Sequence, residues 1–166
     1  PFTLLELNGN HEAAVIEMGM NHTGEIERPS KMVMPEIAII TSIGAGHLEF
    51  LGTVENVARA KSEITAGMKK DSLLLVNGDT ECLNVVYEFA EKAALKVLTY
   101  GLSERCNFKP SSFKMSQGGV SLVYSDVEFF VPLYGKHNLY NLFATVALAD
   151  VLGLSLEAVK EKLSSF

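Results

Sequence analysis

Residues 36–68 read EIAIITSIGAGHLEFLGTVENVARAKSEITAGM, and this stretch contains the pattern that decides the fold. The apolar run Glu36–Ile43 is typical of a buried strand, and Gly44–His47 is a glycine-containing loop. The segment Thr53–Met68 then has apolar residues at helical spacing. A strand, a loop and a helix in this order predict one unit of an α/β fold.

The same pattern recurs along the first hundred residues. Further apolar runs of strand length are Ala13–Ile16, Ser72–Val76 and Lys96–Tyr100, and further helical segments are Gly24–Met34 and Thr80–Ala94. Short apolar strands that alternate with helices predict a mostly parallel sheet flanked by helices.

From Phe108 onward the pattern changes. Three short strands are predicted at Phe113–Met115, Val120–Tyr124 and Val127–Val131, with turns at Gly118-Gly119 and Ser125-Asp126. Two helices follow, one after Gly135 to about Leu152 and one over Ser155–Leu163 with Ser155 as its cap. We therefore expect an α/β fold with a small antiparallel β element, built as a single domain over residues 1–166.

Composition excludes several classes of protein. The 166 residues are 48% hydrophobic, which suffices for one well-buried domain. A net charge of -6 with interspersed acids and bases argues against nucleic-acid binding. Cys82 and Cys106 form no metal-ligand pattern, so a cytoplasmic, reducing location is expected. No apolar run has membrane-spanning length, so no membrane insertion is expected.

Lys61 occupies an unusual position for a charged residue. At about 100° per residue, it falls in the middle of the apolar face of Thr53–Met68, whereas Glu55 and Glu63 fall outside that face. A lysine there either extends its ammonium to solvent, finds a carboxylate or loses its charge. If it is neutral and takes up carbon dioxide, it becomes a carbamate, which is an anionic oxygen ligand for a cation.

Two other polar residues follow predicted strands. His47 lies in the loop after Glu36–Ile43, and Glu17 ends the run Ala13–Ile16. Ligands of open α/β sheets bind at the carboxyl ends of the strands, where nucleotide-binding folds place acids that hold Mg²⁺. Each residue alone is also explained as an ordinary solvated side chain. Together with Lys61, they predict a site at this edge of the sheet.

A second cluster lies at residues 135–141, which read GKHNLYN. Asn138 and Asn141 are three residues apart at a helix start, so their amides share one face. A carboxamide presents a donor beside an acceptor, which matches the N6/N7 edge of adenine. The alternative is that Asn138 caps the helix and Asn141 is a polar surface residue.

Four segments in this order resemble the Mur ligase family. They are EMGMNHTGEI at 17–26, PEIAIIT at 35–41 with AGHLE at 45–49, AKSEI at 60–64, and GKHN at 135–138 with Asn141. The first segment resembles the branch that joins D-alanyl-D-alanine to UDP-N-acetylmuramoyl-tripeptide. The resemblance covers nearly the whole chain and implies a P-loop NTPase-like central domain of an ATP-dependent ligase.

The resemblance implies catalytic and metal-binding roles for three residues. Glu17 would hold a Mg²⁺ that bridges the β- and γ-phosphates of ATP. His47 and carbamylated Lys61 would hold a second Mg²⁺ beside the γ-phosphate and the substrate carboxylate.

The resemblance also implies ligand contacts. His137, Asn138 and Asn141 would bind the nucleotide, and Asn21 and His22 would face the peptide substrate. The implied partners are UDP-N-acetylmuramoyl-tripeptide, whose carboxylate ATP activates as an acyl phosphate, and D-alanyl-D-alanine. The amine of the latter would attack the carbonyl carbon of the acyl phosphate and displace phosphate, which gives an amide.

One family motif does not occur in these residues. No G-x-x-x-x-G-K-[ST] phosphate loop is found, and the Gly135-Lys136 pair precedes His137 and belongs to another motif. We therefore expect a fragment that lacks the phosphate loop and the N- and C-terminal domains, and that folds, binds ATP weakly and does not ligate. Open alternatives are a diaminopimelate- or lysine-adding ligase, folylpolyglutamate synthase, or a noncatalytic α/β interaction domain.

Overall fold

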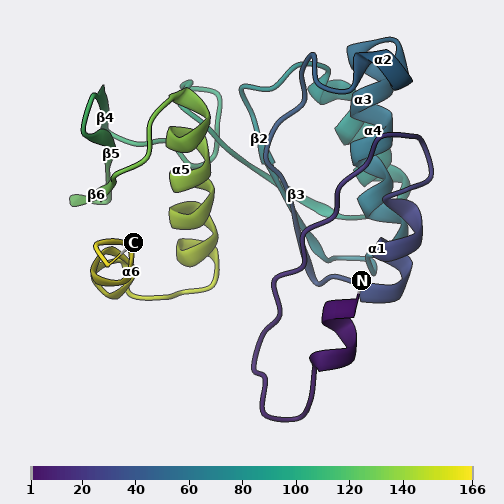
Figure 1. The fold of residues 1–166 in the computed structure, drawn as a ribbon, viewed down its shortest axis with the longest axis horizontal. Helices are drawn as coiled ribbons and strands as arrows, with labels where there is room; N and C mark the ends of the chain where they lie inside the picture. The colour runs from purple at the N-terminus through teal and green to yellow at the C-terminus, as the bar shows by residue number, and fades with distance from the viewer. Residues whose placement is uncertain (1, 166) are drawn as a thin grey trace. The chain divides into compact units, whose positions relative to one another are not determined.

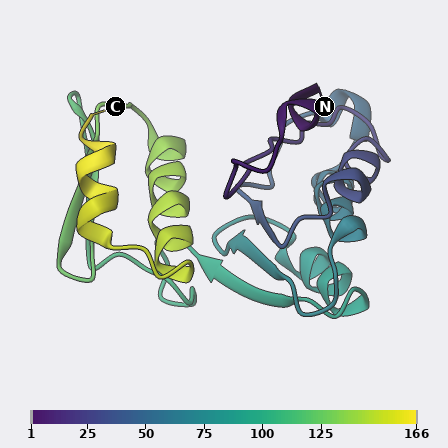
Figure 2. The ribbon, with the colours of Figure 1, turned by 90° about the horizontal axis from the view of Figure 1, so that it is seen from below.

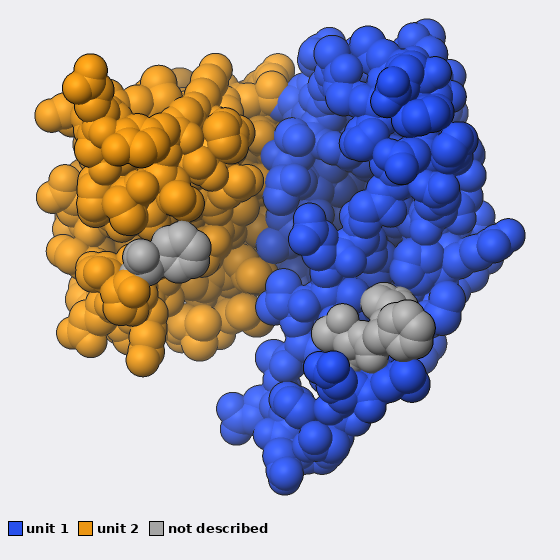
Figure 3. All heavy atoms as spheres, in the orientation of Figure 1, with its two compact units in different colours: residues 1–74, 80–97 blue, residues 75–79, 98–166 orange. Residues whose placement is uncertain are grey.

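The computed structural model describes residues 2–165 and consists of two compact units (Figure 3). Unit 1 comprises Pro1–Leu74 and Thr80–Val97, and unit 2 comprises Leu75–Asp79 and Leu98–Phe166. That residues 1–166 fold as a single domain stays a prediction, because a compact unit need not fold independently.

A three-stranded parallel sheet has the strand order β1-β2-β3, as the alternation of strands and helices predicted (Figure 1). These strands are β1 (Ile37–Ile40), β2 (Leu73–Asn77) and β3 (Lys96–Tyr100). Strand β3 has the predicted bounds, whereas β1 is shorter than the predicted run Glu36–Ile43. Leu74, Leu75 and Val76 of β2 are fully buried, which places β2 in the core.

The predicted buried strand at Ala13–Ile16 is wrong. Within residues 2–165, this segment has no strand assignment, and the Val15 side chain is 94% exposed. A strand exists only when its backbone hydrogen-bonds to a neighbouring strand. Among the described residues, β1 is an edge strand of the sheet, and residues 13–16 are not part of it. An apolar run alone therefore did not suffice.

Unit 1 contains several short helices (Figure 1). They are the 3-10 helix η1 (Phe2–Glu6), α1 (Glu27–Val33), α2 (Leu48–Leu51), α3 (Val54–Ser62), the 3-10 helix η2 (Glu63–Gly67) and α4 (Leu83–Lys92), which follows Cys82. The Thr53 hydroxyl caps α3 by accepting a hydrogen bond from the Asn56 N–H at 3.2 Å. None of the helices formed by residues 2–165 is long and apolar enough to span a bilayer.

Glu63 is buried, contrary to the expectation that it lies outside the apolar face. The helix tightens from α to 3-10 winding at Glu63, so the rotation per residue changes there. The Glu63 carboxylate accepts hydrogen bonds from the backbone N–H groups of Gly24 at 2.6 Å, Ile26 at 3.3 Å and Glu27 at 3.4 Å. Helix α1 has no side-chain cap of its own, so Glu63 caps it from another part of the sequence.

We expect Glu63→Gln to lower the free energy of unfolding by about 2 kcal/mol, because one carboxylate oxygen becomes an NH₂ group that faces backbone donors and leaves at least one of them unpaired. Urea unfolding followed by circular dichroism measures this change. Glu55→Gln is the matched control, because Glu55 is exposed and pairs only with Arg59 at 2.7 Å. Equal effects of the two substitutions would contradict the capping role.

Helix α1 and η2 approach each other closely at Ser30 and Gly67. The Ser30 side chain is fully buried, and its hydroxyl donates to the Ile64 carbonyl at 2.5 Å and accepts from the Gly67 N–H at 3.1 Å. A Cβ atom added to Gly67 would lie 2.0 Å from the Ser30 carbonyl oxygen. Only glycine fits at this contact.

Unit 2 contains the predicted antiparallel sheet β4 (Ser112–Ser116), β5 (Gly119–Tyr124) and β6 (Val127–Val131). Ser125 and Asp126 join β5 to β6, and both have positive φ, as a two-residue type I′ turn requires. The first turn is one residue earlier than predicted, because Gly119 already pairs with Ser116 in the ladder.

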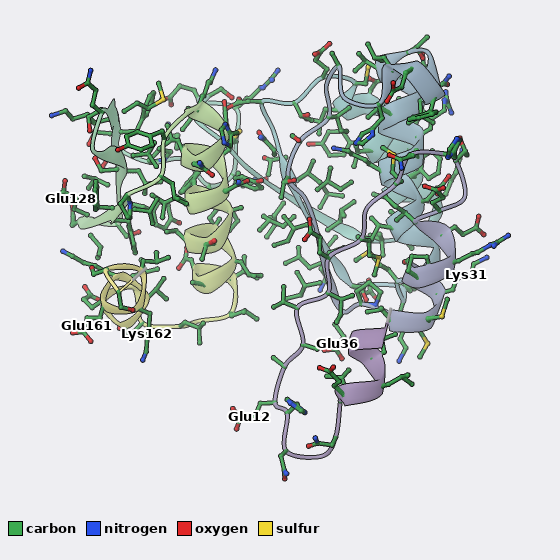
Figure 4. All side chains as sticks on the ribbon, viewed as in Figure 1. Glu12, Lys31, Glu36, Glu128, Glu161 and Lys162 are labelled. Carbon is green, nitrogen blue, oxygen red and sulfur yellow. The ribbon has the colours of Figure 1, made fainter. Side chains whose placement is uncertain are left out.

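Two helices lie against one side of this sheet, α5 (Lys136–Val151) and α6 (Leu156–Leu163) (Figure 2). The Phe143 ring of α5 packs edge-on against Tyr124, with 5.6 Å between ring centroids. Ser155 caps α6 as predicted, accepting a hydrogen bond from the Ala158 N–H at 3.3 Å. The labelled charged side chains of unit 2 point outward: Glu128, Glu161 and Lys162 (Figure 4).

Candidate functional site

A cavity of about 210 Å³ in unit 1 lies at the carboxyl end of β1. Its lining includes all three residues that the sequence placed at this edge, Glu17, His47 and Lys61. The remaining lining residues are Met18, Gly19, Met20, Ile26, Ile39, Ile40, Thr41 and Ile64. The predicted proximity of the three polar residues is therefore confirmed, while their chemical roles stay predictions.

Lys61 projects from α3 and is half-buried. Its ammonium donates a hydrogen bond to the Ser42 carbonyl, with 2.5 Å between Nζ and the oxygen, and burial lowers the pKa of the amine. Among residues 2–165, no carboxylate forms an ion pair with it. The structure therefore gives a lysine that is more readily neutral than an exposed one, next to a cavity.

His47 is held by backbone geometry rather than by burial. Its φ of 62° lies in the left-handed region, which few residues other than glycine adopt, and its side chain is exposed. Upstream, the Thr80 hydroxyl donates to the Ile43 carbonyl at 2.7 Å and accepts from the Ile43 N–H, which fixes the start of the loop. In this conformation, His47 lines the cavity.

The unmodified side chains do not complete a metal site by themselves. Among residues 2–165, no three His, Cys, Asp or Glu side chains lie close enough together to hold a metal ion. Glu17 and His47 are the two such residues in this cavity. A carbamate on Lys61 would add a second oxygen donor to the carboxylate of Glu17, and such oxygen ligands suit Mg²⁺. The donor set therefore fits Mg²⁺ only if Lys61 is modified.

Asn21 and His22 lie outside this cavity. Their backbone N–H groups donate to one Glu25 oxygen at 2.6 and 3.1 Å, and the His22 ring contacts the other oxygen at 3.2 Å. The hydrogen bond from the Asn21 amide is the main reason that the pKa of Glu25 is lowered. The His22 ring also lies 4.9 Å from that of Phe50, measured between centroids. His22 lines a separate, open groove along the start of α1.

The second predicted cluster lies in the first two turns of α5, in unit 2. Asn138 donates from its side chain to the Tyr134 carbonyl at 2.8 Å, and Asn141 donates to the Asn138 side-chain oxygen at 3.5 Å. The two amides therefore share one face, as predicted. The His137 ring folds over Gly135, where an added Cβ atom would lie 2.8 Å from it.

Sequence reasoning missed Asp79 and Tyr140, which contact each other in unit 2. The Tyr140 hydroxyl donates to the Asp79 carboxylate at 3.0 Å. Asp79 comes two residues after the end of β2, so the rule that drew attention to Glu17 and His47 applies to it equally. That signal was present in the sequence and was not used.

Comparisons with known proteins point to one family. Residues 1–149 match the profile of the Mur ligase middle domain. The chain is 36% identical over 166 residues to the UDP-N-acetylmuramoyl-tripeptide–D-alanyl-D-alanine ligase of Bacillus subtilis, covering 99% of this chain. It is 31% identical over 178 residues to the ligase of that name from Escherichia coli, again covering 99% of this chain.

A solved structure agrees with these relatives. The crystal structure of MurF from Acinetobacter baumannii superposes with a TM-score of 0.85 at 31% sequence identity and covers 98% of this chain. The chain spans only 35% of the Bacillus subtilis protein, 37% of the Escherichia coli protein and 36% of the Acinetobacter baumannii chain.

Proposed function

The chain belongs to the Mur ligase middle domain family, and from this premise we propose that it is the nucleotide-handling part of an ATP-dependent peptide ligase. The intact protein joins D-alanyl-D-alanine to UDP-N-acetylmuramoyl-tripeptide. This choice of substrates is supported by the relatives named above and by the segment EMGMNHTGEI at 17–26. A cytoplasmic location is part of the same proposal.

One observation carries the proposal: a half-buried lysine shares a cavity with a glutamate and a histidine at the end of a parallel strand. A noncatalytic interaction domain does not require this combination. An ammonium without a carboxylate partner is costly to desolvate, so the cavity favours the neutral amine that carbon dioxide modifies. The carbamate that forms from this amine would be a third ligand, beside the Glu17 carboxylate and the His47 imidazole.

The residues of the cavity prepare the reaction by position. In the proposed reaction, the peptide carboxylate attacks the γ-phosphorus of ATP, giving an acyl phosphate and ADP, and the incoming amine then displaces phosphate. Bound Mg²⁺ would offset the charge of the phosphate oxygens. Glu17 would hold one Mg²⁺, and His47 and the Lys61 carbamate would hold a second. The hydrogen bond to the Ser42 carbonyl fixes the position of the Lys61 side chain, which lines the cavity.

The nucleotide base is assigned to the first two turns of α5. The hydrogen bond from Asn141 to Asn138 leaves the Asn141 amide oxygen able to accept from the adenine N6 amine. The remaining N–H groups of the two amides can donate to N7. His137 lies beside them at the same end of the helix.

We expect the intact protein to release phosphate from ATP only when both UDP-N-acetylmuramoyl-tripeptide and D-alanyl-D-alanine are present. A coupled phosphate assay with competing amines measures this dependence. Diaminopimelate and lysine, offered with UDP-N-acetylmuramoyl-dipeptide, are the controls, and they should give less than about one-hundredth of the rate, because a site built for one ligand leaves polar groups unpaired with another. Turnover with either of them would assign the protein to another branch, and no turnover with any amine would favour a noncatalytic domain.

A further inference from the structure

Asp79 is the centre of a hydrogen-bonded cluster that the proposed reaction does not use. One oxygen of its carboxylate accepts from the Leu102 N–H at 2.6 Å, the Ser103 N–H at 3.3 Å and the Tyr140 hydroxyl at 3.0 Å. The other oxygen lies 3.9 Å from the Cys106 sulfur. Burial favours protonation of Asp79, but the hydrogen bonds from Ser103, Leu102 and Tyr140 together hold its pKa below the ordinary value. The carboxylate is therefore charged at neutral pH.

Two glycines let the backbone approach this cluster closely. A Cβ atom added to Gly101 would lie 2.8 Å from the Asp79 carboxylate and 2.7 Å from the Cys106 sulfur. A Cβ atom added to Gly78 would lie 2.6 Å from the same sulfur. Asp79 is half-buried and accepts hydrogen bonds from three donors, so its role follows from the groups that it holds.

What Asp79 holds is the N-terminal part of α5. Tyr140 lies at the start of the second turn of this helix, between the two asparagines assigned to adenine. The N-cap of α5 is Gly135, which provides no side-chain hydrogen bond to the turn. The Lys136 ammonium lies 5.7 Å from the centre of the Tyr140 ring, so the ring also contacts the preceding turn. The Tyr140–Asp79 bond thus ties the start of this otherwise uncapped helix to the end of β2.

We propose that Asp79 and Tyr140 are positioning residues, which fix the N-terminal part of α5 so that Asn138 and Asn141 present their amides to adenine. This inference rests on the proposed function, since it assumes that this part of the helix binds the base of ATP. Neither residue needs to touch the nucleotide. A bond to an ionised acceptor is stronger than a neutral one, which suits it to hold a turn in a single orientation.

The test is Tyr140→Phe in the intact protein, compared with Tyr124→Phe. Tyr124 offers a matched control, because its hydroxyl donates to the Asp150 carboxylate at 2.7 Å near the other end of α5. We expect Tyr140→Phe to raise the KM for ATP about tenfold and to reduce the preference for ATP over GTP about tenfold, which corresponds to about 1.4 kcal/mol. The kcat at saturating ATP and the KM values of the other two substrates should stay within about twofold, and Tyr124→Phe should change none of these quantities.

Asp79→Asn supplies the second arm. It should also raise the KM for ATP, because an amide oxygen accepts the hydrogen bond from Tyr140 more weakly than a carboxylate does. The double variant should have no higher KM for ATP than Tyr140→Phe alone, because both substitutions act on the same bond. The ATP-to-GTP ratio is measured within one preparation, so partial loss of folded protein does not alter it. The inference would be wrong if Tyr140→Phe and Tyr124→Phe had equal effects on the KM for ATP, or if the KM values of all substrates rose equally. In that case, turnover by the wild-type protein would still support the ligase function. A wild-type protein that uses no ATP would overturn both.

Discussion

Lys61→Ala should reduce turnover of the intact protein by at least about 10³-fold. The substitution removes the amine that becomes the carbamate, and with it the third donor of a cavity in which only Glu17 and His47 are conventional ligands. Loss of a single group that stabilises charge in a transition state costs about 10²–10³ in kcat, and a metal ligand also holds the ion itself. Initial rates of phosphate release measure the effect.

Two further variants separate the carbamate from a simple positive charge. Lys61→Arg keeps a cation that can donate to the Ser42 carbonyl, but a guanidinium stays protonated and does not form a carbamate, so it should be as inactive as Lys61→Ala. Arg59→Ala is the control on the same helix, because Arg59 is exposed and pairs with Glu55, and it should keep nearly full activity. If Lys61→Arg retains more than about a tenth of the wild-type rate, the metal-ligand role is wrong.

Gly67→Ala should lower the free energy of unfolding by about 4 kcal/mol. The new methyl group would lie 2.0 Å from the Ser30 carbonyl oxygen, 2.2 Å from its carbon and 2.6 Å from its hydroxyl oxygen. Two of these atoms are backbone, so no side-chain rotation relieves the overlap, and α1 must move away from η2. That movement also breaks the hydrogen bond from the Gly67 N–H to Ser30.

Urea unfolding of Gly67→Ala and Gly9→Ala measures this effect against a matched control. Gly9 has ordinary backbone geometry and no atom within 4 Å of an added Cβ, so its substitution should change stability by less than about 0.5 kcal/mol. A loss below about 1 kcal/mol at Gly67 would show that the two helices separate easily.

The sequence predicted those elements that depend on local pattern. The cap of α6 at Ser155 and the strands on either side of Ser125-Asp126 follow from residue type and spacing, because each is stabilised by neighbours in the chain. The bounds of β3 follow from its apolar run, although β3 also needs β2 as its partner. The gathering of Glu17, His47 and Lys61 was predictable for a different reason. Parallel strands end at one edge of a sheet, so topology brought together residues that are far apart in sequence.

The failures involve partners that the sequence does not specify. Ala13–Ile16 has the composition of a strand, but strand formation needs a paired backbone. The expectation that Glu63 lies outside the apolar face assumes an α-helical rotation through residue 63. The winding changes to 3-10 at Glu63, which alters the direction of its side chain. One clue existed: an acid near the C-terminal end of a helix opposes the helix dipole, so it required another partner. That partner, the backbone at Gly24–Glu27, lies 36 to 39 residues away in the chain.

The two cysteines differ in accessibility, so the comparison of their rates of alkylation reports on the opening of the structure. Cys82 is partly accessible and lies in unit 1, whereas Cys106 is buried in unit 2 beside Gly78 and Gly101. An alkylating reagent can reach Cys106 only when its surroundings open, so its labelling rate follows the opening of unit 2. Cys82 is already accessible, so its labelling rate gives an internal reference that does not depend on opening. Mass spectrometry of a time course of alkylation therefore measures the opening of unit 2 around Cys106, with no label introduced into the protein.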